Sequence, residues 1–504
     1  FDIEFYKNSY EDLVKISDEN FDFILHYIRF GKDEGRVYKN SIKSKAEDEQ
    51  VDSDENNKLE HYTFIDKNNM EILMHFDEVY YLEHNPDIKK SGINAYEHYM
   101  TYGWKERRNP NDWFDVNFYL NQYSDIKEAS MEPFSHYLLY GQYEGRLAKQ
   151  QDENTLELNY EELMDFGYKF YGPVFSVFFQ FIDSYVKNNN IKKLYFLARE
   201  GYFLKQMYER LASENFVKDI DTEYLLVSRA FLFRLLLGTD KDVDYALKAR
   251  FNGTLKSLLE DRFALNMNEI DEFLLTQEEL SMPVLLPENM DEIKTFLSAK
   301  VQTHSLNFIQ ESFNAYEKYL NELGFLKEEQ PCVVDFGYNG TIQKTLSKLF
   351  MKDLSGVYFI NSNKSNQEVL GDNICEFISC FREGVTFGEG YELLEKSLVF
   401  EGLLTSPEGQ LRNILNINGN VKSFHGIHTT AQHKFHYLDA IVEGAIQFMV
   451  EMNKSNVDSQ RFTEEVEKIF SVNVKNIDHS LLKLLELDDK ISGFNVINLS
   501  IVIN

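Results

Sequence analysis

The sequence predicts an α/β core built on a parallel sheet, preceded by all-α helical-hairpin repeats and followed by a helical C-terminal region. The core is predicted because short apolar runs, typical of buried strands, alternate with helix-like segments in the middle of the chain. The repeats are predicted because one aromatic-rich template recurs near the start. We expect the repeats at 1–150, the α/β domain at 155–414 and the helical region at 415–504.

The repeat template occurs three times, at 1–38, 76–109 and 114–148. Each copy carries Phe-Asp, an aromatic pair, Asp, His-Tyr, Gly, Glu and Arg in this order, and the last two copies keep an offset of 38 residues throughout. We expect each copy to fold as a helical hairpin, with the first Asp as N-cap and the Gly ending the second helix. The histidine of each copy should be packed and hydrogen-bonded within its repeat. These histidines are His26, His98 and His136.

An acidic segment separates the first two copies and is expected to be a flexible linker or an exposed loop. It spans 39–70, and its centre from Ser41 to Glu60 is nearly free of apolar residues. The whole chain has 52 Lys and Arg against 83 Asp and Glu, a net charge of −31. Such a field repels phosphate backbones, so we expect no nucleic-acid partner. An anionic ligand would need a local cluster of basic side chains and backbone N–H groups.

The composition predicts a globular protein of a reducing compartment. Hydrophobic residues make up 43% of the chain, enough for a sizeable core. Cys332, Cys375 and Cys380 suit neither a disulfide framework nor a zinc site. No apolar run reaches the ~18 residues that a transmembrane helix needs, and no signal peptide opens the chain at Phe1. We therefore expect a cytoplasmic protein without a transmembrane segment, either free or peripheral at the inner face of the membrane.

The α/β domain is expected to contain four strands with helices between them. A long helix should cover Tyr160–Lys187, with a break near Gly172 and Pro173. Alternation of strands and helices favours a parallel sheet, whose carboxyl ends meet at one edge. The predicted strands are Lys193–Ala198, Tyr224–Val227, Cys332–Val334 and Gly356–Ile360, and the predicted helices are Tyr202–Leu211, most of 240–325, Ile342–Phe350 and most of the tail from about Leu415.

The turn after the third predicted strand is the best candidate for a site. Asp335 ends a buried strand, and Gly337, Asn339, Gly340 and Thr341 lead into a helix. Glycines let the backbone approach an anion, and the free N–H groups at a helix start hold phosphate. The Asp335 carboxylate suits sugar hydroxyls or a metal ion. The alternative is an ordinary strand-to-helix turn, because the segment is neither a Walker loop nor a dinucleotide fingerprint.

Two further turns follow predicted strands and should lie at the same edge. Arg199, Glu200 and Gly201 can present a guanidinium and backbone N–H groups to pyrophosphate, or can simply form an Arg-Glu pair that caps the turn. Ser228 and Arg229 add a hydroxyl and a charge. Ligands bind at the carboxyl ends of strands in α/β sheets, which favours a joint site. The basic side chains expected to gather there are Arg199, Lys205, Arg229 and Lys344.

These turns resemble the ligand loops of type I phosphoribosyltransferases, which implies a Rossmann-like sheet that binds phosphoribosyl pyrophosphate, with Mg²⁺ as cofactor. Phe336 departs from the pattern, since many members carry a second acid there. The resemblance assigns Arg199, Glu200 and Gly201 to pyrophosphate, and Asp335, Asn339, Gly340 and Thr341 to the 5′-phosphate and ribose. On the same basis Asp335, Arg199 and Glu200 are the expected catalytic residues, and Gly201, Ser228, Arg229, Gly337, Asn339, Gly340 and Thr341 are expected to bind the donor.

The same turns, with Glu401-Gly-Leu-Leu and the His-Tyr…Gly…Glu-Gly-Arg repeats, are similar to domains of bacterial capsule and O-antigen glycosyltransferases. This resemblance implies transfer of a phosphoribosyl unit to a glycan or lipid-linked glycan, with other glycosyltransferases as possible partners. Such domains are often labelled haloacid-dehalogenase-like. A sugar-phosphate phosphatase of that kind and a non-catalytic scaffold for glycosyltransferases are therefore the alternatives.

The phosphatase alternative lacks its nucleophile. Such an enzyme needs an Asp at the end of its first strand and a second Asp two residues later. Here Ala198 ends the strand, and the Asp219–Thr222 string precedes an apolar run. For a glycosyltransferase, Glu392 and Glu401 are the candidate bases. A cluster of His425, His428, His433 and His436 near the start of the tail has no Cys or paired acid beside it and is expected to bind no metal.

Overall fold

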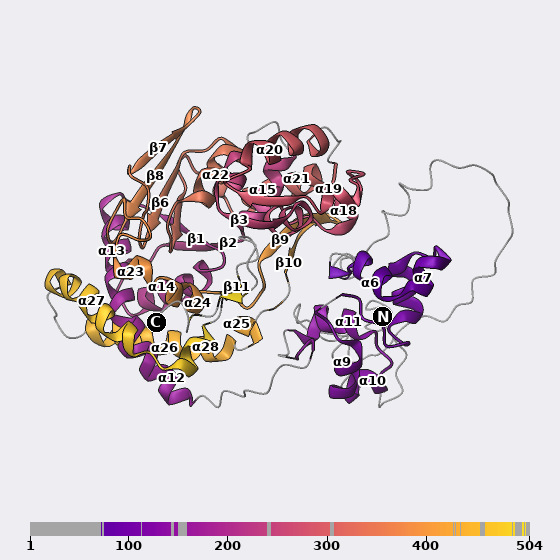
Figure 1. The fold of residues 1–504 in the computed structure, drawn as a ribbon. Coiled ribbons are helices and arrows are strands. Elements are labelled where there is room, and N and C mark those ends of the chain that lie inside the picture. Colours follow the sequence, from indigo (N-terminus) through magenta and orange to yellow (C-terminus); the bar gives the residue numbers. More distant parts are fainter. Residues whose placement is uncertain are drawn as a thin grey trace, which may run out of the picture. The chain divides into compact units, whose positions relative to one another are not determined.

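The computed structural model has a six-stranded sheet between two layers of helices, with a smaller helical module in the N-terminal part of the chain (Figure 1). The chain divides into the units 1–64 and 65–504, and the described elements all belong to the second. The first repeat copy and the acidic linker at 39–70 lie outside the described residues. The structure describes residues 72, 75–111, 113–142, 146–149, 159–238, 243–302, 307–426, 428, 430–433, 435–453, 459–485, 487–488, 496–497 and 499.

The central sheet confirms the predicted α/β core. Five of its strands are parallel, and β7 pairs antiparallel with β8 at one side of the sheet. The spatial order is β2-β1-β5-β6-β8-β7. The strands are β1 (Lys193–Leu197), β2 (Asp221–Leu225), β5 (Cys332–Asp335), β6 (Leu354–Tyr358), β7 (Gln367–Leu370) and β8 (Asn373–Ser379).

Helices cover both faces of this sheet because its central strands are apolar on both faces. On one face Leu194 and Phe196 of β1 pack in a core with helices that include α13 (Gly172–Asn188), α14 (Gly201–Ser213) and α26 (Phe435–Asn453). On the other face Tyr195 and Leu197 pack in a second core. The helices of this second layer include α15 (Arg229–Leu237), α21 (Asn307–Glu322) and α22 (Thr341–Phe350).

The long helix before β1 has no break at Pro173. Helix α12 (Tyr160–Phe166) continues through a π-helical turn, η5 (Gly167–Tyr171), into α13. Pro173 lies in the first turn of α13, directly after the π-helical turn. Gly167 allows the helix to approach α26, since a Cβ there would lie 1.8 Å from the carbonyl oxygen of Ile441. The close approach of these helices favours one continuous segment over the predicted interruption.

The stretch between β2 and β5 is less helical than predicted. Strands β3 (Phe251–Thr254) and β4 (Pro283–Leu286) form an antiparallel pair, and short helices surround it. Each of these strands is only four residues long, and in β4 buried and exposed residues alternate. Such short strands are hard to recognise in a leucine-rich sequence that is otherwise typical of helices. The short helices are α16 (Asp244–Lys248), α17 (Leu255–Ser257), η6 (Leu258–Arg262), α18 (Met267–Asp271), α19 (Gln277–Leu280), α20 (Met290–Phe296) and η7 (Leu297–Val301), and η8 (Phe325–Lys327) follows α21.

The predicted helical tail begins instead with a β-hairpin. Strands β9 (Leu411–Ile417) and β10 (Asn420–His425) are joined by Asn418 and Gly419, both with positive φ. This is the preferred two-residue hairpin turn, and the Asn-Gly pair was the sequence signal that the helical prediction missed. The rest of the region is largely helical. Its other elements, with two short helices before the hairpin, are α23 (Glu392–Glu395), α24 (Leu398–Leu403), α25 (Thr430–His433), α27 (Ser459–Asn473), η9 (Val474–Asn476), α28 (His479–Leu484), β11 (Leu487–Asp488) and β12 (Val496–Ile497).

The second and third repeat copies share one fold of three short helices, where the sequence predicts two. In the second copy, Asn85 and Pro86 divide the first predicted helix into α6 (Glu78–His84) and α7 (Pro86–Ser91). As predicted, the Asp77 carboxylate caps α6, since its Oδ1 accepts a 2.9 Å hydrogen bond from Tyr80 N. The remaining elements are α8 (Ala95–His98) and η3 (Tyr99–Gly103), with α9 (Val116–Gln122), α10 (Ser124–Glu128), α11 (Pro133–His136) and η4 (Tyr137–Gly141) in the third copy.

Within the second and third copies, histidine, tyrosine and glycine form one packed unit, as predicted for the histidine. Tyr81 Oη lies 2.9 Å from His98 Nδ1, and Tyr119 Oη lies 2.9 Å from His136 Nδ1. A Cβ on Gly103 would lie 2.1 Å from Tyr81 Oη, so glycine is required for the tyrosine to reach its partner. The conserved spacing of the template therefore encodes a packing contact.

The arginines of the second and third copies pair with acids of their own copy. Arg108 binds Asp87 through two nitrogens, at 2.8 and 2.7 Å. Arg146 binds Asp125 in the same way, at 2.9 and 2.8 Å. Each pair joins the end of a copy to its second short helix. In the part of the chain that the structure describes, no helix is long and apolar enough to span a bilayer.

Candidate functional site

The topology of the sheet marks one place where a ligand pocket is expected. Strand β2 lies on one side of β1, and β5, β6 and β8 follow on the other side. The loops that leave β1 and β5 therefore diverge toward opposite faces, and a crevice opens between the carboxyl ends of these two strands. Glu200 follows β1 and Asp335 ends β5, so both predicted turns meet at this crevice.

A pocket of about 160 Å³ occupies this position. A single bound water needs ~10–15 Å³, so the pocket has room for a group the size of a phosphate or a pentose. Six predicted site residues line it. They are Glu200, Arg229, Asp335, Gly337, Asn339 and Thr341. The other lining residues are Phe336, Tyr338, Ile342 and Glu401.

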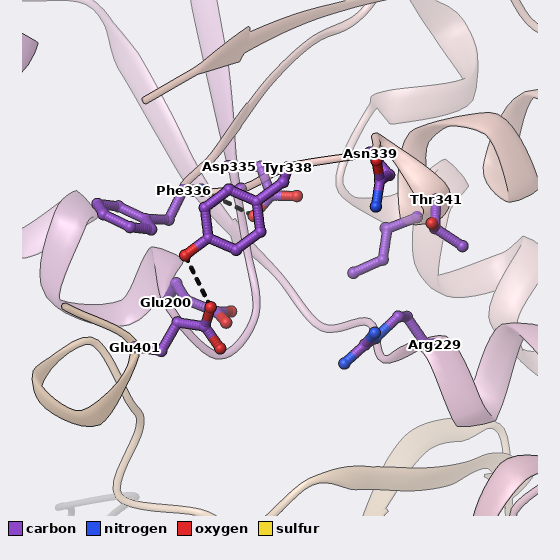
Figure 2. A pocket seen from close by; sticks show the side chains of 10 residues that line it. Glu200, Arg229, Asp335, Phe336, Tyr338, Asn339, Thr341 and Glu401 are labelled. Atoms are coloured by element: carbon purple, nitrogen blue, oxygen red, sulfur yellow. Dashed lines mark hydrogen bonds between the residues drawn. The ribbon is translucent and has the colours of Figure 1, made fainter. Parts of the chain in front are cut away.

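One side of the pocket is acidic. Figure 2 shows Glu200 and Glu401 together below the ring of Tyr338, with Asp335 behind. Asp335 is only 7% exposed, and its Oδ1 accepts a 2.8 Å hydrogen bond from Phe336 N. Burial and the negative charge of Glu200 raise the pKa of Asp335 well above its usual value, while that hydrogen bond and Arg229 oppose the rise. The carboxyl group is therefore poised to gain from a cation bound beside it.

Tyr338 fixes the third carboxylate. Its hydroxyl donates a 2.8 Å hydrogen bond to Glu401 Oε1, which links the loop after β5 to α24. Burial and the negative charge of Glu401 raise the pKa of Tyr338 well above its usual value, so the phenol remains a hydrogen-bond donor. Sequence reasoning proposed Glu401 as a base but did not place Tyr338 in the site. Its only signal was its position inside the Gly-rich turn.

The opposite side of the pocket carries hydrogen-bond donors. Arg229, Asn339 and Thr341 lie together in Figure 2, away from the carboxylates. Arg229 is exposed. Its side chain makes no hydrogen bond or ion pair with another described residue. Helix α22 begins at Thr341, so its first N–H groups add a partial positive charge on this side. The pocket is thus divided into an anion-attracting and a cation-attracting half.

Gly340 shapes the turn between these halves. Its φ is +61°, and a Cβ would lie 2.4 Å from Phe377 Cε1 and 3.2 Å from Tyr358 Oη. Only glycine satisfies both conditions at this position. By contrast, a Cβ on Gly337 would meet no atom within 4 Å. Gly340 thus sets the backbone that starts α22, while Gly337 leaves open space in the pocket.

Four predicted site residues do not line the pocket. Arg199 is not among the lining residues, and the guanidinium in the pocket comes from Arg229. Gly201 is needed for packing, since a Cβ would lie 2.5 Å from the backbone carbon of Phe196. Ser228 caps α15 and donates a 2.6 Å hydrogen bond to Leu411 O. The fourth is Gly340, which holds the turn beside the pocket.

The predicted gathering of basic side chains is reduced to Arg229. Lys205 pairs with Glu209 at 2.6 Å, and Lys344 pairs with Glu368 at 2.8 Å. Glu392, the other candidate base, pairs with Lys475 at 3.0 Å and does not line the pocket. Its ion pairing and hydrogen bonds lower its pKa. Glu401 is therefore the better-placed of the two candidate bases.

The residues present fit a Mg²⁺ ion that arrives with its ligand. Among the described residues, no group of three or more His, Cys, Asp or Glu side chains converges as a metal-ligand set, and this includes the described histidines of the tail. Mg²⁺ is commonly held by one or two carboxylates together with substrate phosphates. Asp335 and Glu200 provide such carboxylates in the pocket.

Comparison with known proteins adds no assignment. No family model matches the chain, and a search of curated proteins finds no match either.

Proposed function

We propose that this chain is a glycosyltransferase of bacterial surface-polysaccharide assembly. It transfers a 5-phosphoribosyl unit from phosphoribosyl pyrophosphate to a hydroxyl of a glycan or lipid-linked glycan. One observation carries the proposal: the pocket at the carboxyl ends of β1 and β5 is divided into a half with donors and a half with carboxylates. The donor substrate is divided in the same way, with a 5-phosphate at one end and ribose hydroxyls and a cation-bound pyrophosphate at the other.

The donor half suits the 5-phosphate. Thr341 offers a hydroxyl, Asn339 an amide and Arg229 a guanidinium, and α22 begins at Thr341, where the dipole of the helix adds partial positive charge. In this assignment Arg229 replaces Arg199, which does not line the pocket. The phosphate thereby anchors the substrate at a point remote from the reacting carbon, which positions that carbon.

The carboxylate half suits the ribose and the leaving group. Asp335 orients the ribose hydroxyls, and its negative charge stabilises the positive charge that develops at the anomeric carbon. Asp335 and Glu200 would hold a Mg²⁺ ion that arrives with the donor, and the ion would supply positive charge to the leaving pyrophosphate. In the transfer, the bond from the anomeric carbon to pyrophosphate breaks, and pyrophosphate leaves with the electron pair. A bond to the acceptor oxygen forms as Glu401 accepts the hydroxyl proton.

Two observations weigh against the phosphatase alternative. Asp221 begins β2, so the Asp219–Thr222 string lies at the amino ends of the parallel strands, whereas the pocket lies at their carboxyl ends. The strand that should end in a nucleophilic Asp ends in Leu197, followed by the buried Ala198. Asp335 is the only Asp in the pocket lining, and Phe336 and Gly337 follow it where a second acid would be required.

Calorimetry with phosphoribosyl pyrophosphate and Mg²⁺ tests the proposal. We expect saturable binding by the wild-type chain and weaker binding by Asp335→Asn and Thr341→Val, each with its fold intact by circular dichroism. Asp219→Asn is the matched control, because it removes a carboxylate outside the pocket and should bind normally. Hydrolysis of a generic phosphate ester without donor binding would favour the phosphatase, and neither activity would favour the scaffold.

A further inference from the structure

A phenylalanine stands in solvent directly beside the pocket. Phe387 is 57% exposed, and it is the only phenylalanine among the large apolar side chains that are exposed in the described part of the chain. Its ring meets the ring of pocket-lining Tyr338 edge to face, with centroids 5.8 Å apart. Single exposed apolar residues are common on protein surfaces. This one is distinguished by its contact with the residue that holds Glu401.

The loop that carries Phe387 is built to hold it in place. The loop follows β8, and its glycines at 384, 388 and 390 have positive φ. The Glu395 carboxylate accepts hydrogen bonds from Gly388 N at 2.5 Å and from Gly390 N at 3.3 Å. Glu389 accepts a further bond from Thr386 N at 3.0 Å. An exposed apolar ring gains little free energy from burial. The position of Phe387 is therefore fixed by the hydrogen bonds of its loop and not by packing in a core.

The charges around the ring restrict what it can bind. Glu200 and Glu401 line the adjacent pocket. In the loop itself, hydrogen bonds to Thr386 and the nearby charge of Lys364 lower the pKa of Glu389, so this carboxylate stays ionised at neutral pH. An acceptor that carries its own negative charge would be repelled by Glu389 and Glu401. A neutral ligand with many hydroxyls would find acceptors in the carboxylates and an apolar platform in the phenyl ring.

We propose that Phe387 is the acceptor platform of the site and that it binds a neutral pyranose ring. The C–H face of the sugar packs on the aromatic face, whose electron density attracts the positive C–H groups. The hydroxyl rim then faces Glu401 across Tyr338. This inference rests on the proposed function, because it takes the acceptor to be a glycan. It adds the class of sugar and the residue that selects it.

Saturation-transfer NMR on the whole chain tests the platform. The probes are the methyl glycosides of glucose and N-acetylglucosamine, which are neutral, and the methyl glycoside of glucuronic acid, which is anionic. Wild-type protein should transfer saturation to the ring protons of the neutral probes. In Phe387→Ala the transferred signal should be about tenfold weaker. Phe387→Trp should keep or strengthen the signal, because it enlarges the aromatic face. Val369→Ala, a change at a 66% exposed side chain of β7, is the matched control and should leave it unchanged.

The outcomes separate this inference from the proposed function. No transfer to either neutral probe, equal transfer in Phe387→Ala, or stronger transfer to the glucuronide would each overturn the platform. Calorimetry with phosphoribosyl pyrophosphate and Mg²⁺ on the same variants should show unchanged donor binding. If the donor does not bind but the pyranosides bind through Phe387, the donor assignment fails and the platform stands. If the donor binds and the pyranosides do not, the reverse holds.

Discussion

The Tyr338 hydroxyl and the Glu401 carboxylate are joined by a 2.8 Å hydrogen bond across 63 residues of sequence. The bond connects the loop after β5 to α24, and both side chains line the pocket. A carboxylate held by a phenol has a fixed orientation, and this hydrogen bond occupies one of the several acceptor positions of its two oxygens. This is the geometry that a base needs before its substrate arrives.

We expect Tyr338→Phe to lower the rate of transfer without weakening donor binding. A hydrogen bond to a charged group contributes ~1.5–3 kcal/mol, which corresponds to about 10- to 100-fold in kcat if Glu401 loses its orientation. The measurement is steady-state transfer together with donor calorimetry. Tyr168→Phe is the matched control, because Tyr168 donates a similar 2.7 Å bond to Glu451 on the surface. Full turnover by Tyr338→Phe would remove Glu401 from the mechanism.

We expect Asp335→Asn to stabilise the metal-free fold at neutral pH. Burial and Glu200 raise the folded-state pKa of Asp335, so the folded state binds a proton more tightly than the unfolded state. Stability therefore falls as pH rises from the unfolded pKa through the folded one. Asparagine avoids this loss and can still accept the bond from Phe336 N. Thermal unfolding should show a gain for the variant at pH 7 that vanishes near pH 4.

The repeats offer a control with the opposite sign. The hydrogen bonds from Arg108 lower the pKa of Asp87 to about 2, so its contribution to stability is present above the unfolded pKa and is lost as pH falls toward 2. Asp87→Asn should destabilise slightly at pH 7, since both partners are exposed enough for solvent to screen the pair. A stabilising effect of both variants at neutral pH would contradict the assigned origin of the two shifts.

We expect Gly340→Ala and Gly337→Ala to separate folding from binding. A left-handed conformation costs an L-residue ~1–2 kcal/mol, and at position 340 the added Cβ also displaces Phe377. Gly340→Ala should therefore lower the free energy of unfolding by at least about this amount. Gly337→Ala adds a methyl in open space, so it should leave stability nearly unchanged and weaken donor binding. Denaturant titration and calorimetry check the pair, and equal loss of stability in both variants would contradict the turn geometry.

The parallel core could be predicted because buried central strands are continuous apolar runs. Strand β1 falls inside its predicted range, β5 extends one residue beyond its range, and β2 and β6 begin a few residues before theirs. The edge elements were harder to foresee, since β7 is exposed or half-buried along its length and lacks an apolar run. The β9–β10 hairpin was predictable from Asn418 and Gly419, but the apolar spacing around them also suits a helix.

The site could be predicted only as far as strand ends reveal it. Asp335, Glu200 and Arg229 follow strands of one sheet, so topology brings them together. Whether a side chain turns into the pocket depends on the local backbone, which is why Arg199 and Arg229 could not be ranked in advance. Tyr338 contacts Glu401, which is 63 residues away in the sequence, and such a contact cannot be predicted from the spacing of residues.

We expect Gly103→Ala to destabilise the repeats because its Cβ would lie 2.1 Å from Tyr81 Oη. The methyl must displace the tyrosine and break its hydrogen bond to His98. Tyr81→Phe removes the hydroxyl and costs a buried hydrogen bond, about 1 kcal/mol or more. In the double variant the methyl no longer meets a hydroxyl, so the combined loss should be smaller than the sum.

Tryptophan fluorescence can follow this double-mutant cycle in the full-length chain. The chain has 2 tryptophans, Trp104 and Trp113, and both pack in the core of the repeats. Their emission during denaturant unfolding therefore reports on the repeats alone, while circular dichroism follows the whole chain. Gly92→Ala is the matched control for glycine removal, since a Cβ there meets no atom within 4 Å and only its φ of +70° opposes the change. Strict additivity of Gly103→Ala and Tyr81→Phe would show that the glycine is not required by the tyrosine.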